Sequence, residues 1–171
     1  MVRAFLVLLM MTGFLAACDS TTGTTQIGAD GQPLPKAYKI RRGETGQIQN
    51  RMLDSVNSLR AASGAGPLVL NSKLTSAASA HSRDMAKQGR PWHFGSDGSS
   101  PIDRVVKTGY PGQFLGENIS ETFESELVTL AAWMDQRDTR SVILDPKATN
   151  MGFSWHQESN GRIWWTLITG S

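Results

Sequence analysis

Two side chains in the middle of the chain could do acid–base or metal chemistry. They are His93, in Trp92-His93-Phe94, and Glu117, in Gly116-Glu117-Asn118-Ile119. An imidazole next to a carboxylate can act as a general base. The same imidazole can instead simply fix the loop that follows it. Both interpretations of His93 remain open at the level of sequence.

The residues after His93 do not favour nucleophilic hydrolysis or phosphate binding. Ser99 and Ser100 are close to His93 in the sequence, but no Gly-x-Ser-x-Gly elbow is present. The run 95–100 looks like a phosphate cradle at a helix N-terminus, yet it lacks the lysine of a P-loop. We therefore expect a turn that caps the helix after it, with a bound anion as the alternative.

Cys18 is the only cysteine, and its surroundings predict export. Arg3 and the apolar run 5–11 are typical of a signal peptide, and the run is too short to span a bilayer. The end of the segment, Leu15-Ala16-Ala17-Cys18, resembles the lipobox of bacterial lipoproteins. That resemblance implies that the thiol of Cys18 carries a diacylglycerol and that 1–17 is removed as a lipoprotein signal peptide. An ordinary secretory peptide, with a free thiol left behind, is the alternative.

The composition and length of the chain limit its partners and the way in which its domain can be stabilised. The 171 residues carry a formal net charge of +2, which becomes about +1 without Arg3, so no global field favours nucleic acid as a partner. A single cysteine cannot form an intrachain disulfide, so the domain must be stabilised by its core. After the signal peptide, the length suits one domain and a tail.

The residues after the cysteine predict a tether. Segment 18–46 is rich in Thr, Gly, Gln and Pro, shows no apolar period, and is typical of a flexible spacer. Its exception is the basic, partly apolar stretch 36–42. This stretch could contact anionic lipid headgroups or other envelope polymers, or it could pack on the domain as an extra arm.

Apolar spacing and cap residues predict helices in the folded part, 47–171. The first begins near Gln47 and ends at Gly64, and Asn71 is a good N-cap for the second, which ends around Gly89. Ser100-Pro101-Ile102-Asp103 predicts a capping box for a third helix that runs to about Lys107. The fourth, 125–136, carries the apolar residues Leu127, Leu130, Ala131 and Met134 on one side.

The C-terminal end predicts strands. Segments 151–158 and 162–169 are rich in aromatic and branched residues, and Ser159-Asn160-Gly161 between them is a strong hairpin signal. A further strand is expected around 116–123. Strands gathered at the end, with helices between, indicate an α+β layered domain with an antiparallel sheet.

Five ordered motifs, which together cover about residues 48–170, resemble the bacterial branch of the CAP superfamily. This superfamily is also called SCP-like, after the cysteine-rich secretory proteins, antigen 5 and the pathogenesis-related 1 proteins. The motifs are Leu53-Asp54-Ser55-Val56-Asn57-Ser58-Leu59-Arg60, the segment 77–86 around His81, the segment 92–101, Gly116-Glu117-Asn118-Ile119, and Ile143-Leu144-Asp145-Pro146.

The resemblance implies a three-layer α-β-α sandwich with a shallow cleft, where many members hold a divalent metal with two histidines and two acidic residues. His93 matches the first histidine and Glu117 the first glutamate. Thr139 stands where the second histidine should be. A threonine does not replace an imidazole as a zinc ligand at comparable affinity. We therefore expect no cofactor, with zinc on His93 and Glu117 as the alternative.

The second acidic position of the implied cleft stays open. Asp135 lies near it, the uncharged Gln136 is one step further, and Asp138 is a third choice. His156, in the predicted hairpin, could replace the missing histidine only if the fold brought it into the cleft. The ligand cleft expected from the resemblance is thus His93, Glu117, Asp135 and Thr139.

Other conspicuous side chains have simpler interpretations. His81 shares the apolar face of the second helix, so we expect a packed histidine that donates to a carbonyl. Trp155, Trp164 and Trp165 could form a stacking surface for a sugar or lipid. Alternation places Trp164 and Trp165 on opposite faces of the sheet, so at least one should be in the core.

These observations favour a lipid-anchored cell-envelope protein whose domain is a non-catalytic binding module for a lipid, a glycan or a partner protein. The alternative is an envelope peptidase or esterase that uses His93 and Glu117, with or without a metal. The membrane that carries Cys18, inner or outer, stays open.

Overall fold

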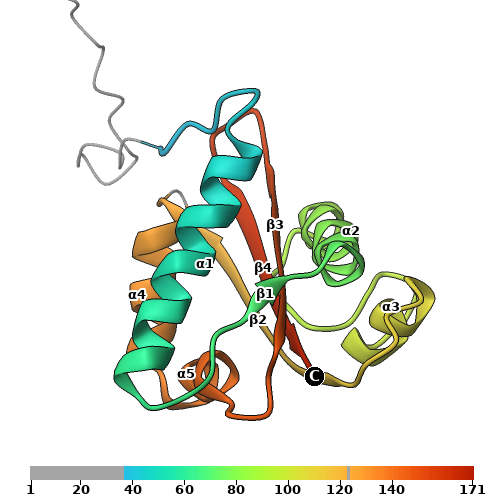
Figure 1. The fold of residues 1–171 in the computed structure, drawn as a ribbon. Coiled ribbons are helices and arrows are strands. Elements are labelled where there is room, and N and C mark those ends of the chain that lie inside the picture. Colours follow the sequence, from blue (N-terminus) through green and yellow to red (C-terminus); the bar gives the residue numbers. More distant parts are fainter. Residues whose placement is uncertain (1–36, 123) are drawn as a thin grey trace, which may run out of the picture. The chain divides into compact units, whose positions relative to one another are not determined.

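The computed structural model describes residues 37–122 and 124–171. The predicted signal peptide, Cys18 and Lys36 lie outside these residues, as does Phe123 at the end of one predicted strand. Nine elements form within them (Figure 1). The helices are α1 (Thr45–Ala62), α2 (Ser72–Gln88), α3 (Pro101–Lys107), α4 (Glu126–Asp135) and α5 (Arg137–Leu144); the strands are β1 (Val69–Leu70), β2 (Phe114–Thr122), β3 (Asn150–Gln157) and β4 (Ile163–Gly170).

The sheet lies between two layers of helices. Helices α1, α4 and α5 cover one face, whereas α2 and α3 lie on the other (Figure 1). One core cluster joins the sheet to α1 and α4, and a second joins it to α2 and α3. The expected α+β fold with three layers is confirmed.

The strand order is β1-β3-β4-β2, and the sheet is mixed. Strand β4 pairs antiparallel with β3 and β2, as predicted. The prediction of an antiparallel sheet is wrong at one edge, where β1 pairs parallel with β3. Four helices and β2 separate these two strands, which supplies the long crossover that parallel pairing needs. Two residues are too few for an alternating pattern to reveal β1 in the sequence.

The predicted hairpin is confirmed, and its tryptophans are in the core. Gly161 has a φ of 93° in the turn between β3 and β4, a conformation that glycine adopts without strain. Trp164 and Trp165 are both fully buried, on opposite faces of β4. Trp165 stacks on Phe153 at 5.5 Å, and Trp155 packs against the same cluster. The interpretation of Trp164 and Trp165 as an exposed stacking surface is therefore wrong.

The predicted helix starts are borne out by their caps. Asn71 Oδ1 accepts hydrogen bonds from the backbone N–H groups of Lys73 and Leu74. Ser100 and Asp103 form the predicted capping box, with Pro101 in the first turn. Helix α1 begins at Thr45, two residues before the predicted start.

The region after Ser125 differs from the prediction. The buried side of α4 consists of Glu126, Thr129, Leu130 and Trp133, whereas Leu127 is 42% exposed. Trp133 fixes this orientation, because its Nε1 donates to Ser120 Oγ on β2 at 2.9 Å. Helix α5 was not predicted. Only Ile143 of its eight residues is buried, which is too little to produce a periodic pattern.

Segment 37–44 packs on the domain, so the predicted spacer 18–46 ends before residue 37. Tyr38 and Ile40 pack against the core cluster on the α1 side of the sheet. Gln157 of β3 donates from Nε2 to the carbonyl of Tyr38 at 2.7 Å and accepts from the N–H of Ile40 at 3.1 Å. The packed arm, one of the two alternatives for the basic stretch, is thus observed for residues 37–44.

Arg60 joins α1 to the loop after α5. Its side chain is fully buried, and its guanidinium donates to the carbonyls of Gly66, Ile143, Asp145 and Ala148 at 2.7–3.0 Å. A planar guanidinium with several donors suits such a set of fixed acceptors. Arg60 thus holds in place the loop that leads into β3.

Candidate functional site

Glu117 lies on the face of the sheet that α2 and α3 cover. It pairs across strands with Ile168, which belongs to the core cluster on that face. Its neighbour Asn118 points the opposite way, toward α5, where its Nδ2 donates to the carbonyl of Thr139 at 2.8 Å. Alternation along β2 therefore determines which helices Glu117 can meet.

Arg104 of α3 is the principal partner of Glu117. Its Nη2 lies 2.8 Å from Oε2 and 3.0 Å from Oε1, and both residues are only 7% exposed. Nη1 also donates to the carbonyl of Ser99 at 3.2 Å. The capping box fixes the start of α3, one turn before Arg104, and so positions the guanidinium over the carboxylate. The ion pair satisfies two buried charges that would each be costly alone.

His93 completes the contacts of the carboxylate from the solvent side. Its Nδ1 lies 2.9 Å from Glu117 Oε1, and its side chain is 51% exposed. An ionised carboxylate can only accept, so in a neutral imidazole paired with it the proton is on Nδ1 and Nε2 is the acceptor. The structure thus brings together the two residues that the sequence singled out.

The loop that carries His93 is held by the carboxylates of Asp84 and Asp97. Asp84 accepts hydrogen bonds from the N–H and the hydroxyl of Ser96, both at 2.6 Å. Burial raises the pKa of Asp84, but these bonds outweigh it, and the pKa is lowered overall. Hydrogen bonds from Ser99 hold the pKa of Asp97 at about 2. A side chain at Gly95 would meet Asp97 and Ser99 at 2.6 Å. The run 95–100 is therefore the capping turn that was predicted.

His81 lies beneath this pair, on α2. Its Nε2 is 3.7 Å from Glu117 Oε1, and its side chain is fully buried. By strict geometry neither ring nitrogen has a hydrogen-bond partner within the described part of the chain, but the backbone of Trp92 is close enough to raise the pKa of His81 as an acceptor. The packed histidine is confirmed, and the Trp92 backbone is the group to which its ring can donate. Burial lowers the pKa of His81, and Glu117 opposes this effect.

Thr139 does not lie with His93 and Glu117. Its hydroxyl donates to the carbonyl of Trp133 at 2.6 Å, and its own carbonyl accepts from Asn118. These contacts place it on the α5 side of the sheet, opposite Glu117. A histidine at position 139 would therefore lie on the face of the sheet opposite to Glu117.

The other candidate ligands are also distant from the pair. Asp135 and Asp138 are exposed at the junction of α4 and α5. His156 pairs with Trp164, four residues along β4 from Ile168, the partner of Glu117. At about 3.3 Å per residue, this separation is roughly 13 Å along the strand. The expected cleft of His93, Glu117, Asp135 and Thr139 is therefore not assembled.

The residues present do not fit a resident zinc ion. Among residues 37–122 and 124–171, no group of three or more His, Cys, Asp or Glu side chains is arranged to hold a metal ion. Zinc sites need three or four such donors. In addition, the Arg104 guanidinium contacts both oxygens of Glu117 and would repel a second cation there.

A hollow of about 470 Å³ lies between α2 and α3, next to Arg104. Arg104 forms part of its wall, together with basic residues of both helices. Its lining includes Arg83, Asp84, Lys87, Gly95, Asp97 and Lys107. The hollow therefore offers basic and acidic side chains to a ligand on the Arg104 side of the site.

Arg104 and His81 are the members of the site that sequence reasoning missed. Arg104 follows the capping box in an exposed-looking helix of only seven residues. A helix of this length has no period from which a buried face can be identified. His81 was visible as a polar residue on an apolar face, but the sequence did not show that this face meets Glu117.

The profile of the CAP family, described as "Cysteine-rich secretory protein family", matches residues 53–169. The uncharacterized protein YkwD of Bacillus subtilis (strain 168) is 28% identical over 122 residues, which cover 71% of this chain and 47% of YkwD. The chain thus spans about half the length of this curated relative.

Solved structures share the fold. An extracellular protein of Bacillus anthracis with an SCP domain superposes with a TM-score of 0.66 at 19% identity, over 79% of this chain and 45% of that one. An outer surface protein of Borrelia burgdorferi gives 0.65 at 14% identity, over 79% and 98%. A cysteine-rich secretory protein of Staphylococcus aureus gives 0.65 at 18%, over 84% and 44%.

No helix in the described part of the chain is both long and apolar enough to cross a membrane. The layered fold, the pair of His93 with Glu117 of β2 and the profile match over most of the sequence agree with one another. The chain belongs to the CAP family, the family of the cysteine-rich secretory proteins.

Proposed function

We propose that this protein is a lipid-anchored component of the cell envelope, and that its CAP domain is a non-catalytic, metal-independent binding module. Its ligand is a lipid, a glycan or a partner protein that contacts the surface around His93. The observation that carries the proposal is the ion pair of Arg104 with Glu117. It occupies the carboxylate that a metal or a water molecule would need.

Support for the location comes from the sequence and from relatives. Arg3, the apolar run after it and the lipobox-like residues before Cys18 favour export and lipidation. Two of the structurally similar proteins are described as extracellular and as an outer surface protein. The proposed anchor is a diacylglycerol on Cys18.

The anchor is tested by mass spectrometry of the protein purified from membranes of the producing bacterium. An N-terminal peptide that begins with a diacylated Cys18 is expected, and the Cys18→Ala variant should remain uncleaved and unlipidated. A mature protein with an unmodified Cys18, or one cut elsewhere, contradicts the anchor.

The binding role is tested by capture from envelopes. The mature domain should retain a lipid, glycan or protein, and the variant His93→Ala should retain less, because His93 is the half-exposed member of the site. The matched control is His156→Ala, which removes a histidine from the same face of the sheet outside the site. Equal retention by all three proteins contradicts a ligand at His93.

One observation favours the alternative of a hydrolase. His93 is half-exposed and bonds Glu117 through Nδ1, an imidazole–carboxylate arrangement that suits the activation of a water molecule by Nε2. A hydrolase would cleave a peptide or ester substrate, and His93→Ala would lower its turnover by about 10²-fold or more. We expect equal inactivity of the wild type and the variant on both substrate classes.

A further inference from the structure

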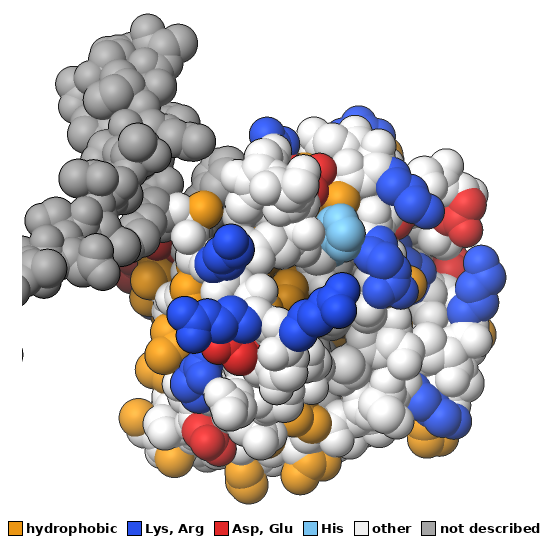
Figure 2. All heavy atoms as spheres, turned by 90° about the horizontal axis from the view of Figure 1, so that it is seen from above, with side chains coloured by type: hydrophobic (Ala, Val, Ile, Leu, Met, Phe, Trp, Pro, Cys, Tyr) orange, Lys and Arg blue, Asp and Glu red, His pale blue; other side chains and the backbone are white. Residues whose placement is uncertain are grey.

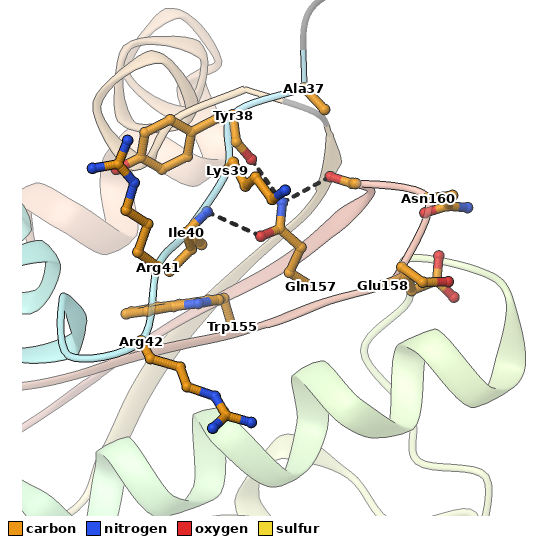
Figure 3. A pocket seen from close by; sticks show the side chains of 12 residues that line it. Ala37, Tyr38, Lys39, Ile40, Arg41, Arg42, Trp155, Gln157, Glu158 and Asn160 are labelled. Atoms are coloured by element: carbon orange, nitrogen blue, oxygen red, sulfur yellow. Dashed lines mark hydrogen bonds between the residues drawn. The ribbon is translucent and has the colours of Figure 1, made fainter.

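The arm, residues 37–44, holds basic side chains at one end of the domain. Figure 3 shows Gln157 of β3 bound to the arm through the carbonyl of Tyr38 and the N–H of Ile40. Tyr38 and Ile40 pack against the core, whereas Lys39 and Arg41 between and after them are exposed. The alternation of an extended segment thus separates an apolar inner side from a basic outer side.

Among the described residues, no ion pair within 4 Å joins the side chains of Lys39, Arg41 or Arg42 to an acid. The one carboxylate of the arm, Glu44, accepts from the backbone N–H of Arg41 at 2.9 Å. Other cations at this end of the domain do have an acidic partner. Arg51 lies 2.8 Å from Glu126, and Arg162 lies 2.9 Å from Glu121. The three arm cations therefore contribute net positive charge to the surface, which the paired arginines do not.

These cations border a depression of about 540 Å³ between the arm and the β3–β4 turn. Trp155 forms its floor in Figure 3, with Gln157, Asn160 and the acidic Glu158 on the side of the hairpin, so that three cations of the arm face one carboxylate across the depression. Figure 2 views the domain from this end and shows Lys and Arg side chains spread over the face, with few acidic ones between them. Tryptophan is enriched at membrane–water interfaces, and clustered basic side chains are attracted to anionic headgroups.

We propose that this arm face, formed by Lys39, Arg41, Arg42 and the rim of the depression at Trp155, docks on the anionic headgroups of a membrane. The occupant follows from charge and from chain order. Residues 19–36 separate Cys18 from the arm, and they span at most about 60 Å when fully extended. The arm is thus the part of the described domain nearest in sequence to the proposed anchor. The inference rests on the proposed function in one respect: the lipid on Cys18 would hold the arm near a membrane.

Vesicle co-sedimentation tests the inference with the chain from Asp19 onward, which lacks the lipid. Binding to vesicles of phosphatidylglycerol and phosphatidylcholine is expected, with none to pure phosphatidylcholine. The variant Lys39→Gln/Arg41→Gln/Arg42→Gln should bind about 100-fold more weakly, at about fivefold for each charge. Added salt should weaken the wild type.

The matched control is Lys73→Gln/Arg137→Gln/Lys147→Gln, which removes the same charge from exposed positions away from the arm. It should bind as the wild type does. Equal losses in both triple variants, or no preference for the anionic vesicles, would overturn the inference. So would tight binding of polyphosphate without vesicle binding, which would indicate a soluble polyanion instead.

The outcomes separate this inference from the proposed anchor. Vesicle binding by the chain without lipid, together with an unmodified Cys18 in the native protein, would retain the docking face and remove the anchor. A diacylated Cys18 in the native protein, without vesicle binding by the chain that lacks the lipid, would retain the anchor and remove the docking face.

Discussion

Arg104 Nη2 lies within 3.0 Å of both carboxylate oxygens of Glu117, in a place where two charges are almost completely shielded from water. The acid that the CAP resemblance assigns to a metal site is therefore bound to a cation from the protein itself. This relationship gives Glu117 a structural partner in a chain whose other expected metal ligands lie elsewhere.

Loss of the Arg104 guanidinium should strongly destabilise the fold. In Arg104→Met, Glu117 keeps its contacts with His93 and, at 3.7 Å, with His81, but becomes a buried charge without its main partner, so the free energy of unfolding should fall by about 3–5 kcal/mol. Urea denaturation measures this change. The double variant Arg104→Met/Glu117→Gln should recover a large part of the loss.

The control for that variant is Lys107→Met on the same helix, whose pair with Asp97 is long and solvent-exposed. It should change the free energy of unfolding by less than about 1 kcal/mol. If Arg104→Met costs no more than Lys107→Met, the ion pair is not a structural determinant of the site.

Introducing the missing histidine should not create a zinc site. Thr139→His would place an imidazole on the α5 side of the sheet, whereas Glu117 and His93 lie on the α2 and α3 side. Calorimetric titration with zinc should give the same weak response for Thr139→His as for Thr139→Ser. Stoichiometric binding that appears only in Thr139→His would show that the positions converge.

Acidification should destabilise the protein through His81. Burial lowers its pKa in the folded state below the ordinary value of 6.5, so the unfolded chain takes up a proton first as the pH falls. The stability due to neutral His81 is present above pH 6.5 and is lost below it, with a slope of at most about 1.4 kcal/mol per pH unit.

Urea unfolding at several pH values between 7.5 and 4.5 measures this slope. Asp84 and Asp97, whose pKa values are lowered, lose their contribution only near and below pH 3.8, outside this range. The variant His81→Gln should be less stable at pH 7.5 but should show a flatter dependence. An unchanged slope in this variant would contradict the assignment to His81.

Gln157 should control the attachment of the arm. In Gln157→Leu, the hydrogen bonds to Tyr38 and Ile40 are lost, at about 0.5–1.5 kcal/mol each, so detachment should become about tenfold more frequent. Limited trypsin digestion should then cleave faster after Arg41, while the domain stays intact. Gln136→Leu, at an exposed position, should digest like the wild type.

Much of the fold could be predicted from the sequence where local signals were strong. Asn71 and the capping box of Ser100 and Asp103 act through hydrogen bonds within four residues, so the sequence contains them completely. The turn at Gly161 is similarly local. Strand β1 and helix α5 were missed because two strand residues, or one buried helix residue, produce no periodicity.

The site was harder to predict because its partners come from distant segments. His93 and Glu117 are 24 residues apart, and only the fold shows that they meet. The side of the sheet on which Thr139 lies depends on its hydrogen bond with Asn118, and so on the direction in which Asn118 points from β2. Both are features of the tertiary structure that the sequence does not show. Arg104 was missed since a basic residue on a short helix usually faces solvent.

The central claim is that the carboxylate of Glu117 serves Arg104 and no metal, and zinc titration of the purified mature chain by calorimetry tests it most directly. We predict that zinc does not bind stoichiometrically, and that wild type and His93→Ala give the same weak calorimetric response. One zinc ion bound per chain, with loss of that binding in both His93→Ala and Glu117→Gln, would contradict it.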